Sequence, residues 1–410
     1  MIKPKIRFKG YQEEWEQRKF KELCDMVTVG IANSATHAYS DSGVVMFRNQ
    51  NIKPNFLDDT DIIHINSEFE VKYKNKRLKK NDLLVARTGY PGTACVVPEK
   101  YENSQTFTTL IARPNENVDP YFLCQYLNSD IGIKYFESTQ IGGGQKNSGA
   151  GILNEMPVTL PSTIEEEKQI ADYFIQLDHL ITLHHRKCEE MKILKKYMLQ
   201  KMFPQNGNSV PEIRFLGFTE DWEQRKFSEM VTIERGGSPR PIDKFITNDK
   251  NGLNWVKIGD APEQGNYITQ TAEKIRPEGL SKTREVHPGD LILSNSMSFG
   301  RPYIMAIDGC IHDGWLAIRD TKKNFDLKFL CTLLGTDSML NQYKAMAAGS
   351  TVNNLNKELV GGTIIAFPML EEQIKIGDYF TSIDHLITLH QKKCDELRNI
   401  KKFMLQNMFI

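Results

Sequence analysis

Apolar residues recur at alternating steps of four and three in two long stretches of the chain, from Ile170 to Met202 and from Ile376 to Met408. Such steps are typical of a coiled-coil seam, in which one face of a helix packs against a partner helix. We therefore predict two helices of about 40 residues, each roughly 60 Å long at 1.5 Å per residue. The seam residues that define the pattern are Ile170, Phe174, Leu177, Ile181 and His184, followed in the second stretch by Ile376, Phe380, Ile383, Ile387 and His390.

The order of the segments constrains how these helices pair. The first helix leads into the region 208–362, and the second helix leads away from it. An antiparallel pair with one domain at each end satisfies this connectivity. The alternative is that each helix packs on its own domain as an ordinary amphipathic helix.

Outside the helices, short apolar runs are separated by Asn, Gly and Pro, which is typical of strands and turns. Each variable region, residues 21–150 and 228–356, is therefore expected to form a small α+β domain of about 130 residues. The expected strands are 44–47, 62–65, 82–86, 94–97 and 107–112, then 255–258, 290–293, 303–307 and 315–318, with helices at 120–127 and 327–334.

The chain contains an internal duplication. Residues 4–20 match residues 211–227 at 12 of 17 positions, and residues 177–203 match 383–409 at 17 of 27 positions. The offsets are 207 and 206 residues, far longer than the period of a solenoid repeat. The regions between these segments diverge. A shared frame with different interiors indicates one task performed on two different targets, in a pseudo-two-fold arrangement.

Composition limits the classes of function. The 52 basic and 52 acidic side chains cancel, so any nucleic-acid surface must be local. No apolar run reaches the ~20 residues needed to cross a bilayer, and the first residues lack a signal-peptide core. The seven cysteines have no C-x-x-C spacing, which is typical of reduced thiols in a cytoplasmic protein without membrane contact.

Motifs for catalysis and metal binding are missing from the sequence. It contains no phosphate-binding loop, nucleophile elbow, dinucleotide fingerprint or Asn-Pro-Pro-aromatic methyltransferase motif. His179 and His184 are five residues apart, which places them on different faces of a helix and disfavours a zinc site. The run 310–313, which holds Cys310, His312 and Asp313, is expected to be structural. We therefore predict no catalytic residue, no metal and no cofactor in this chain.

Polar loops in both variable regions offer the side chains that bind base edges. Arg pairs with guanine, Asn or Gln with adenine, and Ser or Thr with either base. Ordinary turn chemistry is the alternative for any single loop. Lys257 is included because Arg48 aligns with it better than with Arg235. The candidate DNA-binding residues are Arg48, Asn49, Gln50, Arg87, Thr88, Tyr90, Lys146, Asn147, Arg235, Ser238, Arg240, Lys257, Ser294, Asn295, Ser296, Ser298, Arg301, Thr351, Asn353 and Asn354.

Across essentially its whole length the chain resembles the specificity subunits of Type I restriction-modification enzymes. The resemblance rests on the paired Trp-Glu-Gln-Arg-Lys-Phe openings at 15–20 and 222–227 and on the paired Asp-His-Leu-Ile-Thr-Leu-His segments at 178–184 and 384–390. The junction Pro-Met-Leu-Glu-Glu-Gln-Ile-Lys-Ile at 368–376 is similar to the family's entry into each helix. In the first copy of this junction, Glu167 occupies the position equivalent to Gln373 of the second copy.

The resemblance implies two target-recognition domains, 1–155 and 208–362, alternating with two conserved coiled-coil helices, 156–207 and 363–410. Each domain would bind one half of a split target in double-stranded DNA, and the helices would set the spacer. The partners would be two methyltransferase subunits that use S-adenosylmethionine, and motor-nuclease subunits that use ATP and Mg²⁺. Two other classes stay open: a coiled-coil scaffold with two variable protein-binding domains, and a stand-alone nuclease or methyltransferase.

Overall fold

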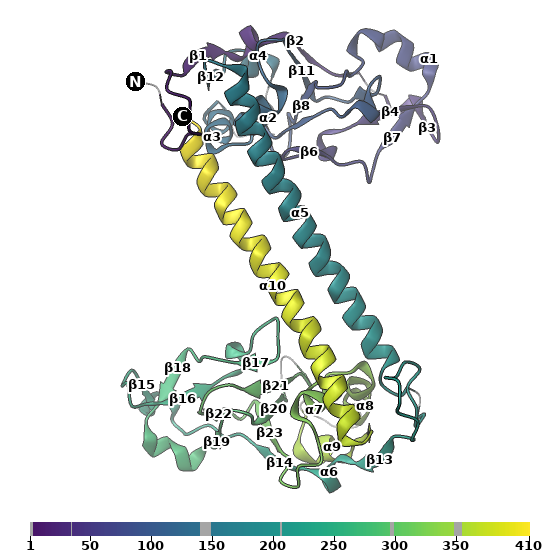
Figure 1. Ribbon diagram of the computed structural model, residues 1–410, viewed down its shortest axis with the longest axis vertical. Helices are drawn as coiled ribbons and strands as arrows, with labels where there is room; N and C mark the ends of the chain where they lie inside the picture. The colour runs from purple at the N-terminus through teal and green to yellow at the C-terminus, as the bar shows by residue number, and fades with distance from the viewer. Residues whose placement is uncertain (1–2, 34, 140–148, 206, 296–298, 348–354) are drawn as a thin grey trace. The chain divides into compact units, whose positions relative to one another are not determined.

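The computed structural model describes residues 3–33, 35–139, 149–205, 207–295, 299–347 and 355–410. The chain divides into two compact units (Figure 1). Unit 1 comprises residues 1–183 and 394–410, and unit 2 comprises residues 184–393. Each unit therefore combines one α+β domain with parts of both long helices.

The domain of unit 1, residues 16–160, contains two four-stranded sheets and two strand pairs. The larger sheet is antiparallel, in the order β2-β11-β8-β9, and the second sheet has the order β10-β4-β7-β3. The strands are β1 (Glu16–Lys19), β2 (Cys24–Val29), β3 (Tyr39–Ser40), β4 (Val44–Phe47), β5 (Ile52–Lys53), β6 (Phe56–Leu57), β7 (Ile63–Ile65), β8 (Leu83–Val85), β9 (Ala94–Val96), β10 (Gln105–Thr106), β11 (Leu110–Pro114) and β12 (Pro157–Leu160).

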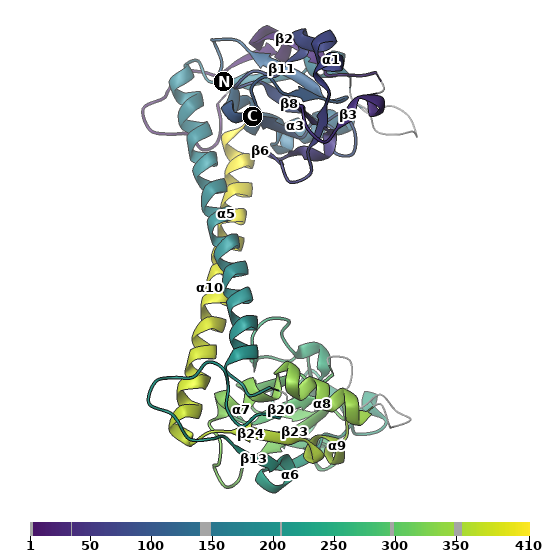
Figure 2. The same ribbon diagram turned by 90° about the vertical axis from the view of Figure 1, so that its right-hand side faces the viewer.

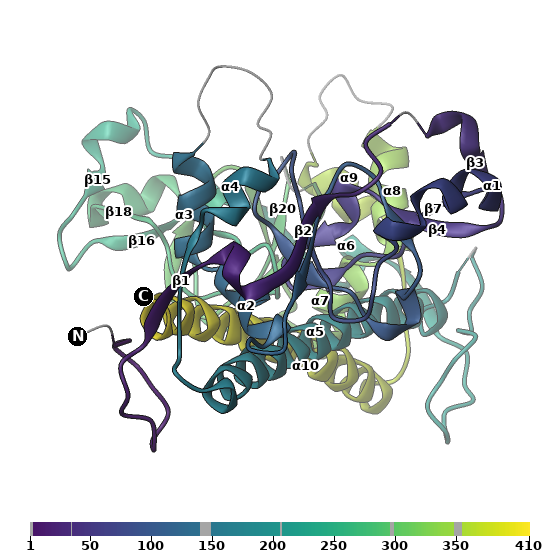
Figure 3. The same cartoon turned by 90° about the horizontal axis from the view of Figure 1, so that it is seen from above.

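Four short helices complete the described part of unit 1, with α1 packed against the second sheet and the other three against the larger sheet. They are α1 (Ser67–Glu70), α2 (Pro120–Leu127), α3 (Asp130–Ser138) and α4 (Ala150–Asn154). The Asp119 side chain caps α2 by accepting a hydrogen bond from the Phe122 N–H, and α2 places Phe122 and Tyr126 in the core. In Figure 3, α2 lies beside the long helix α5 (Ile164–Lys201), whose first turns share this core.

The domain of unit 2, residues 223–367, repeats this plan. Its sheets have the orders β14-β23-β20-β21-β17 and β15-β18-β16-β22-β19, and β13 pairs with β24 as β1 pairs with β12. The elements are β13 (Glu223–Lys226), α6 (Phe227–Met230), β14 (Thr232–Arg235), β15 (Ile246–Thr247), β16 (Leu253–Val256), β17 (Tyr267–Ile268), β18 (Glu273–Ile275), β19 (Arg284–Val286), β20 (Leu291–Ser294), β21 (Pro302–Met305), β22 (Gly309–Ile311), β23 (Trp315–Arg319), α7 (Leu327–Leu334), α8 (Asp337–Ala347), α9 (Lys357–Gly362) and β24 (Ile364–Phe367).

The predicted α+β class, the internal duplication and the two long helices are confirmed. Helices α2 and α7 have the predicted bounds, and the bounds of each strand expected from the sequence lie within about three residues of an observed strand. The long helices are α5, with 38 residues, and α10 (Leu370–Met408), with 39 residues. At the start of α5, Thr163 Oγ1 accepts from the Glu166 N–H.

Within each unit, parts of α5 and α10 run side by side and antiparallel (Figure 2). In unit 1, the Lys401 Nζ lies 2.5 Å from Asp178 Oδ1. In unit 2, the equivalent pair joins Lys195 Nζ to Asp384 Oδ1 at 2.6 Å. The residue numbers of the paired positions increase along one helix and decrease along the other, so the two helices are antiparallel.

The predicted seam is the covered face of both helices. Residues 170, 174, 177, 376, 380, 383 and 387 are buried, and Ile181, His184 and His390 are partly buried. In unit 2 the His184 and His390 rings share a hydrogen bond, with 2.9 Å between the Nδ1 atoms. His179 and His385 are exposed.

Aromatic side chains fix the end of each long helix to a domain. In unit 1, Phe409, which follows α10, stacks on Phe174 and packs against Phe122 and Tyr126. In unit 2, Phe203, which follows α5, packs in the same way against three rings. Those rings are Trp222, Phe329 and Phe380. Such pairs add to the apolar area that both helices bury. None of the helices among the described residues has an apolar stretch long enough to cross a membrane.

Candidate nucleic-acid interface

A tight polar turn follows β4 in unit 1 and carries the first predicted contacts. Arg48 opens a 3₁₀ turn over Asn49–Asn51, and its N–H donates to Asn51 Oδ1 at 2.9 Å. The buried Asn51 amide in turn donates to the carbonyl oxygens of Asp58 and Asp61. A capped turn of this kind holds its side chains in fixed directions.

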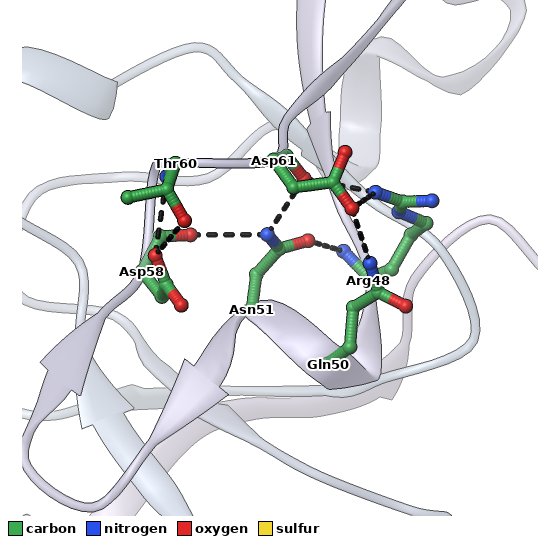
Figure 4. A network of polar contacts seen from close by, with 6 residues as sticks. All are labelled: Arg48, Gln50, Asn51, Asp58, Thr60 and Asp61. Atoms are coloured by element: carbon green, nitrogen blue, oxygen red, sulfur yellow. Dashed lines mark hydrogen bonds and ion pairs between the residues drawn. The ribbon is translucent and has the colours of Figure 1, made fainter. Parts of the chain in front are cut away.

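Two side chains of this turn donate hydrogen bonds to Asp61 (Figure 4). The Arg48 Nη2 atom donates to the Asp61 carbonyl oxygen and to Asp61 Oδ2, both at 2.8 Å. The Gln50 amide donates to the same Oδ2 at 2.6 Å. The Arg48 and Gln50 side chains therefore converge on one carboxylate, which is itself 69% exposed.

Asn49 has an internal role that the sequence analysis did not predict. Its Oδ1 accepts from the Arg87 N–H at 2.7 Å, and its amide nitrogen lies 3.2 Å from Thr108 Oγ1. It thus ties the Arg48 turn to the loop between β8 and β9, which contains Arg87, Thr88 and Tyr90. Tyr90 is 84% exposed. The structure thus brings the first two predicted stretches of this domain together.

Lys257 occupies the equivalent turn in unit 2, in line with its alignment with Arg48. It follows β16, and its N–H donates to Asp260 Oδ2, the third residue of the next 3₁₀ turn. The Lys257 Nζ lies 2.5 Å from Glu273 Oε1 at the start of the neighbouring strand β18. Both domains therefore place a cation after the same strand and pair it with a carboxylate from the facing segment.

A second carboxylate in unit 2, Asp313, lies among three polar side chains. Ser238 Oγ donates to Asp313 Oδ1 at 2.9 Å, and the same oxygen lies 2.9 Å from His312 Nε2. The Arg240 Nη2 lies 3.9 Å from Asp313 Oδ2, and the Arg240 side chain is 84% exposed. The Gly314 N–H donates to His312 Nδ1, which is therefore an acceptor in this arrangement.

The backbone of Asp313 holds the supporting loops. Its carbonyl oxygen accepts from the Asn295 amide at 2.9 Å and from Arg235 Nε at 3.3 Å. Four of the predicted residues, from two separate segments of the domain, therefore meet at one aspartate.

A hollow of about 1130 Å³ lies next to this cluster in unit 2. Its wall includes Ser238, Arg240, Trp255, Lys257, Glu273 and His312. The hollow thus joins the Asp313 cluster to the Lys257 turn and presents hydrogen-bond donors and acceptors beside aromatic surface. These are the groups that recognition of base edges requires.

The structure gives other predicted residues supporting positions. Ser294 and Asn295 are buried, and Ser294 Oγ accepts from the Arg301 N–H, so these two side chains stabilise the loop after β20 and are not on its surface. The Arg301 guanidinium donates to the carbonyl oxygens of Glu263 and Gly265 and lies over the Tyr303 ring.

Seven of the predicted contact residues lie outside the described residues. They are Lys146, Asn147, Ser296, Ser298, Thr351, Asn353 and Asn354.

Three of the cysteine thiols have the properties of core residues. Burial raises the pKa of Cys124 and of Cys331 to about 12, and it also raises the pKa of Cys310. A thiol with a raised pKa is a poor nucleophile and a poor metal ligand. Within the ranges that the structure describes, His, Cys, Asp and Glu side chains form no group of three placed to hold a metal ion.

Sequence reasoning missed Asp61 and Glu273 and assigned His312 and Asp313 to structure alone. Asp61 and Arg48 are 13 residues apart in the sequence, and their pairing is a tertiary contact. One signal was available for the second pair, because His312 and Asp313 break the apolar alternation between β22 and β23.

Comparisons with known proteins agree with this architecture. The sequence matches the family described as "Type I restriction modification DNA specificity domain" twice, over residues 12–192 and 219–399. A putative Type I restriction enzyme MjaX specificity subunit of Methanocaldococcus jannaschii is 24% identical over 95% of this chain and 91% of its own length. The MjaVIII specificity subunit of the same organism is 25% identical over 81% of this chain and 79% of its own length.

Two solved structures share the fold. The S subunit of a Type I restriction-modification system from M. genitalium has a TM-score of 0.64 at 14% identity and covers 100% of this chain and 99% of its own. A chain from a study of assembly and conformational transition in the type I R-M system has a TM-score of 0.54 at 19% identity, over 96% of this chain and 97% of its own. The duplicated frame, the two domains and the double match together place this chain in the family of Type I restriction-modification DNA specificity proteins.

Proposed function

We propose that this chain is the specificity subunit of a Type I restriction-modification complex and that each domain binds one half of a bipartite target in double-stranded DNA. The observation that carries this is the equivalence of the two polar turns. Arg48 follows β4 and Lys257 follows β16, yet the side chains around them differ between the domains. Equivalent positions with different chemistry suit two domains that recognise two different base sequences.

The long helices would act as the spacer between the half-targets. Both α5 and α10 continue from one compact unit into the other without interruption. A helix resists bending far better than a loop, so a continuous pair would fix how many unread base pairs separate the half-targets.

Methyltransferase subunits would dock on the helices. Large apolar side chains remain 37–55% exposed on α5 and α10, and they recur with the 206-residue offset of the duplication. Exposed apolar groups that repeat in both units fit two copies of one protein partner. In unit 1 they are Leu180, Leu183, Ile400 and Phe403, and in unit 2 they are Leu386, Leu389, Leu194 and Tyr197.

The chemistry of the complex would belong to its partners. S-adenosylmethionine would be bound by the methyltransferase subunits, and ATP with Mg²⁺ by the motor-nuclease subunits that join through the complex. This chain would be non-catalytic and supply the choice of DNA sequence.

Methylation mapping tests this proposal. The chain would be expressed with its cognate methyltransferase subunit in a host that lacks the system, and adenine methylation would be mapped over the genome. A new bipartite motif that disappears without this chain supports the proposal, and exchange of residues 21–150 should then change one half of the motif. Soluble, associated proteins without any new motif would favour a scaffold with protein-binding domains.

A further inference from the structure

A carboxylate is an unexpected group on a surface that meets DNA. Phosphates repel it, and affinity for DNA comes largely from cations. Asp61 nevertheless lies at the centre of the predicted contacts of unit 1, and Asp313 lies among a second set of predicted contacts in unit 2. The two residues come from different elements, so the duplication alone does not explain why both domains have one.

In both aspartates the backbone carbonyl oxygen and the side-chain carboxylate bind different groups. In unit 1 the Asp61 carbonyl oxygen accepts from the Asn51 amide, which supports the turn, and the carboxylate accepts from Arg48 and Gln50. In unit 2 the Asp313 carbonyl oxygen accepts from the buried Asn295 amide.

The Asp313 carboxylate likewise faces the more accessible groups. It accepts from Ser238 and lies close to His312 Nε2 and to the exposed Arg240 guanidinium. In both domains the backbone of the aspartate therefore supports the scaffold, and its carboxylate orients the side chains that the sequence analysis assigned to base contacts.

We propose that Asp61 and Asp313 are positioning residues that determine sequence specificity, each within its own half of the DNA target. This inference rests on the proposed function. Each carboxylate holds flexible donors in one geometry before DNA arrives, which lowers the entropy cost of forming bidentate contacts with a base. Some of its lone pairs stay open, so it also offers an acceptor to the amino group of cytosine.

The test replaces each carboxylate by an amide of the same shape. In Asp313→Asn and Asp61→Asn the backbone carbonyl contacts with Asn295 and Asn51 remain, because they do not involve the side chain. The matched controls are Asp308→Asn, whose carboxylate faces His287, and Asp59→Asn, whose carboxylate faces Lys100 and Tyr101.

Each variant would be expressed in full length with its methyltransferase partner, and its motif would be mapped on the host genome. Asp313→Asn should make one or two positions of one half-target degenerate, with the preference for the correct base falling on the order of ten-fold. The other half-target should stay unchanged. Asp61→Asn should do the reverse, and both controls should keep the wild-type motif.

Two further variants separate positioning from folding. Ser238→Ala removes a partner of the Asp313 carboxylate and should loosen the same base positions as Asp313→Asn. Asp313→Glu keeps the charge and should restore part of the preference. A merely structural role would instead lower the thermal midpoint and the methylation of both half-targets together.

Two results would overturn the inference. One is an unchanged motif in both Asn variants when the wild-type motif is clear. The other is tighter binding to unrelated duplex DNA with an unchanged motif, since that would mean that the carboxylates only mask the cations. If the wild-type chain itself produces no motif, the proposed function fails first, so the two failures are distinct.

Discussion

Glutamine in place of Glu167 should stabilise unit 1 at neutral and alkaline pH. Glu167 lies in the first turn of α5, and its side chain is buried, with 1% of the residue exposed. Its Oε2 accepts from the Asp119 N–H at 2.7 Å. Burial, with a smaller contribution from the neighbouring Asp119 carboxylate, raises the pKa of Glu167 from 4.5 to about 8.

Unit 2 shows what glutamine does at the equivalent place. Gln373 Oε1 accepts from the Asp326 N–H at 3.0 Å, as Glu167 accepts from Asp119. The Gln373 amide also donates to the carbonyl oxygens of Pro368 and Asn324. A carboxylate has no proton to donate, so Glu167 can match this pattern only in its protonated form.

The sign of the pH dependence follows from proton binding. Between pH 4.5 and about 8 the folded unit holds a proton on Glu167 that the unfolded chain releases. Stability therefore falls as pH rises through this window, at up to ~1.4 kcal/mol per pH unit. The full shift corresponds to about 5 kcal/mol, of which more than half is lost between pH 5 and pH 8.

The assay uses calorimetry to measure the thermal unfolding of the wild type and of Glu167→Gln from pH 5 to pH 9. The difference in unfolding midpoint between them should grow with pH, reaching on the order of 10 °C at pH 8 for a unit of about 200 residues. Hydrogen exchange of peptides from α2 and the start of α5 assigns the effect to unit 1. The reverse change, Gln373→Glu, should introduce the same pH dependence into unit 2. Parallel pH profiles for wild type and Glu167→Gln would refute this reasoning.

Three further changes test the packing of the long helices. Arg214→Met should lower the free energy of unfolding of unit 2 by about 3–5 kcal/mol in denaturant titration, because it leaves the fully buried Glu372 carboxylate without its bidentate partner; a loss below ~1 kcal/mol would contradict this. Lys195→Asp should destabilise unit 2 by about 1–2 kcal/mol through repulsion from Asp384, and the added change Asp384→Lys should restore most of the loss in a double-mutant cycle. Insertion of one heptad into residues 185–200 should disturb helix pairing or lengthen the spacer of the methylated motif, and an unchanged spacer in a correctly folded protein would exclude the proposed ruler.

The long helices and the duplication were predictable because their signals are local and repeated. The seam residues from Ile170 onward recur with helical spacing. One apolar face that repeats over so many turns is a sufficient signal for an α-helix. The α2 and α7 bounds were likewise predictable, since Asp119 and Asp326 each cap a short apolar run.

The organisation of the candidate interface depended on tertiary structure. The sequence by itself determined which polar side chains exist in the loops, and it identified Arg48 and Lys257 as equivalent. It could not determine that Ser294 is buried, because a short polar run after a strand has the same composition whether its loop faces solvent or the core.

Only the fold brought Asp313 to Ser238 and Asp61 to Gln50, over separations of 75 and 11 residues. These contacts follow from strand order and loop closure, which are properties of the whole domain and leave no periodic signal in the chain. The sequence thus determined the frame and the kind of function, through local periodicity, duplication and motif. The arrangement of the groups that would bind DNA was decided by packing between distant segments.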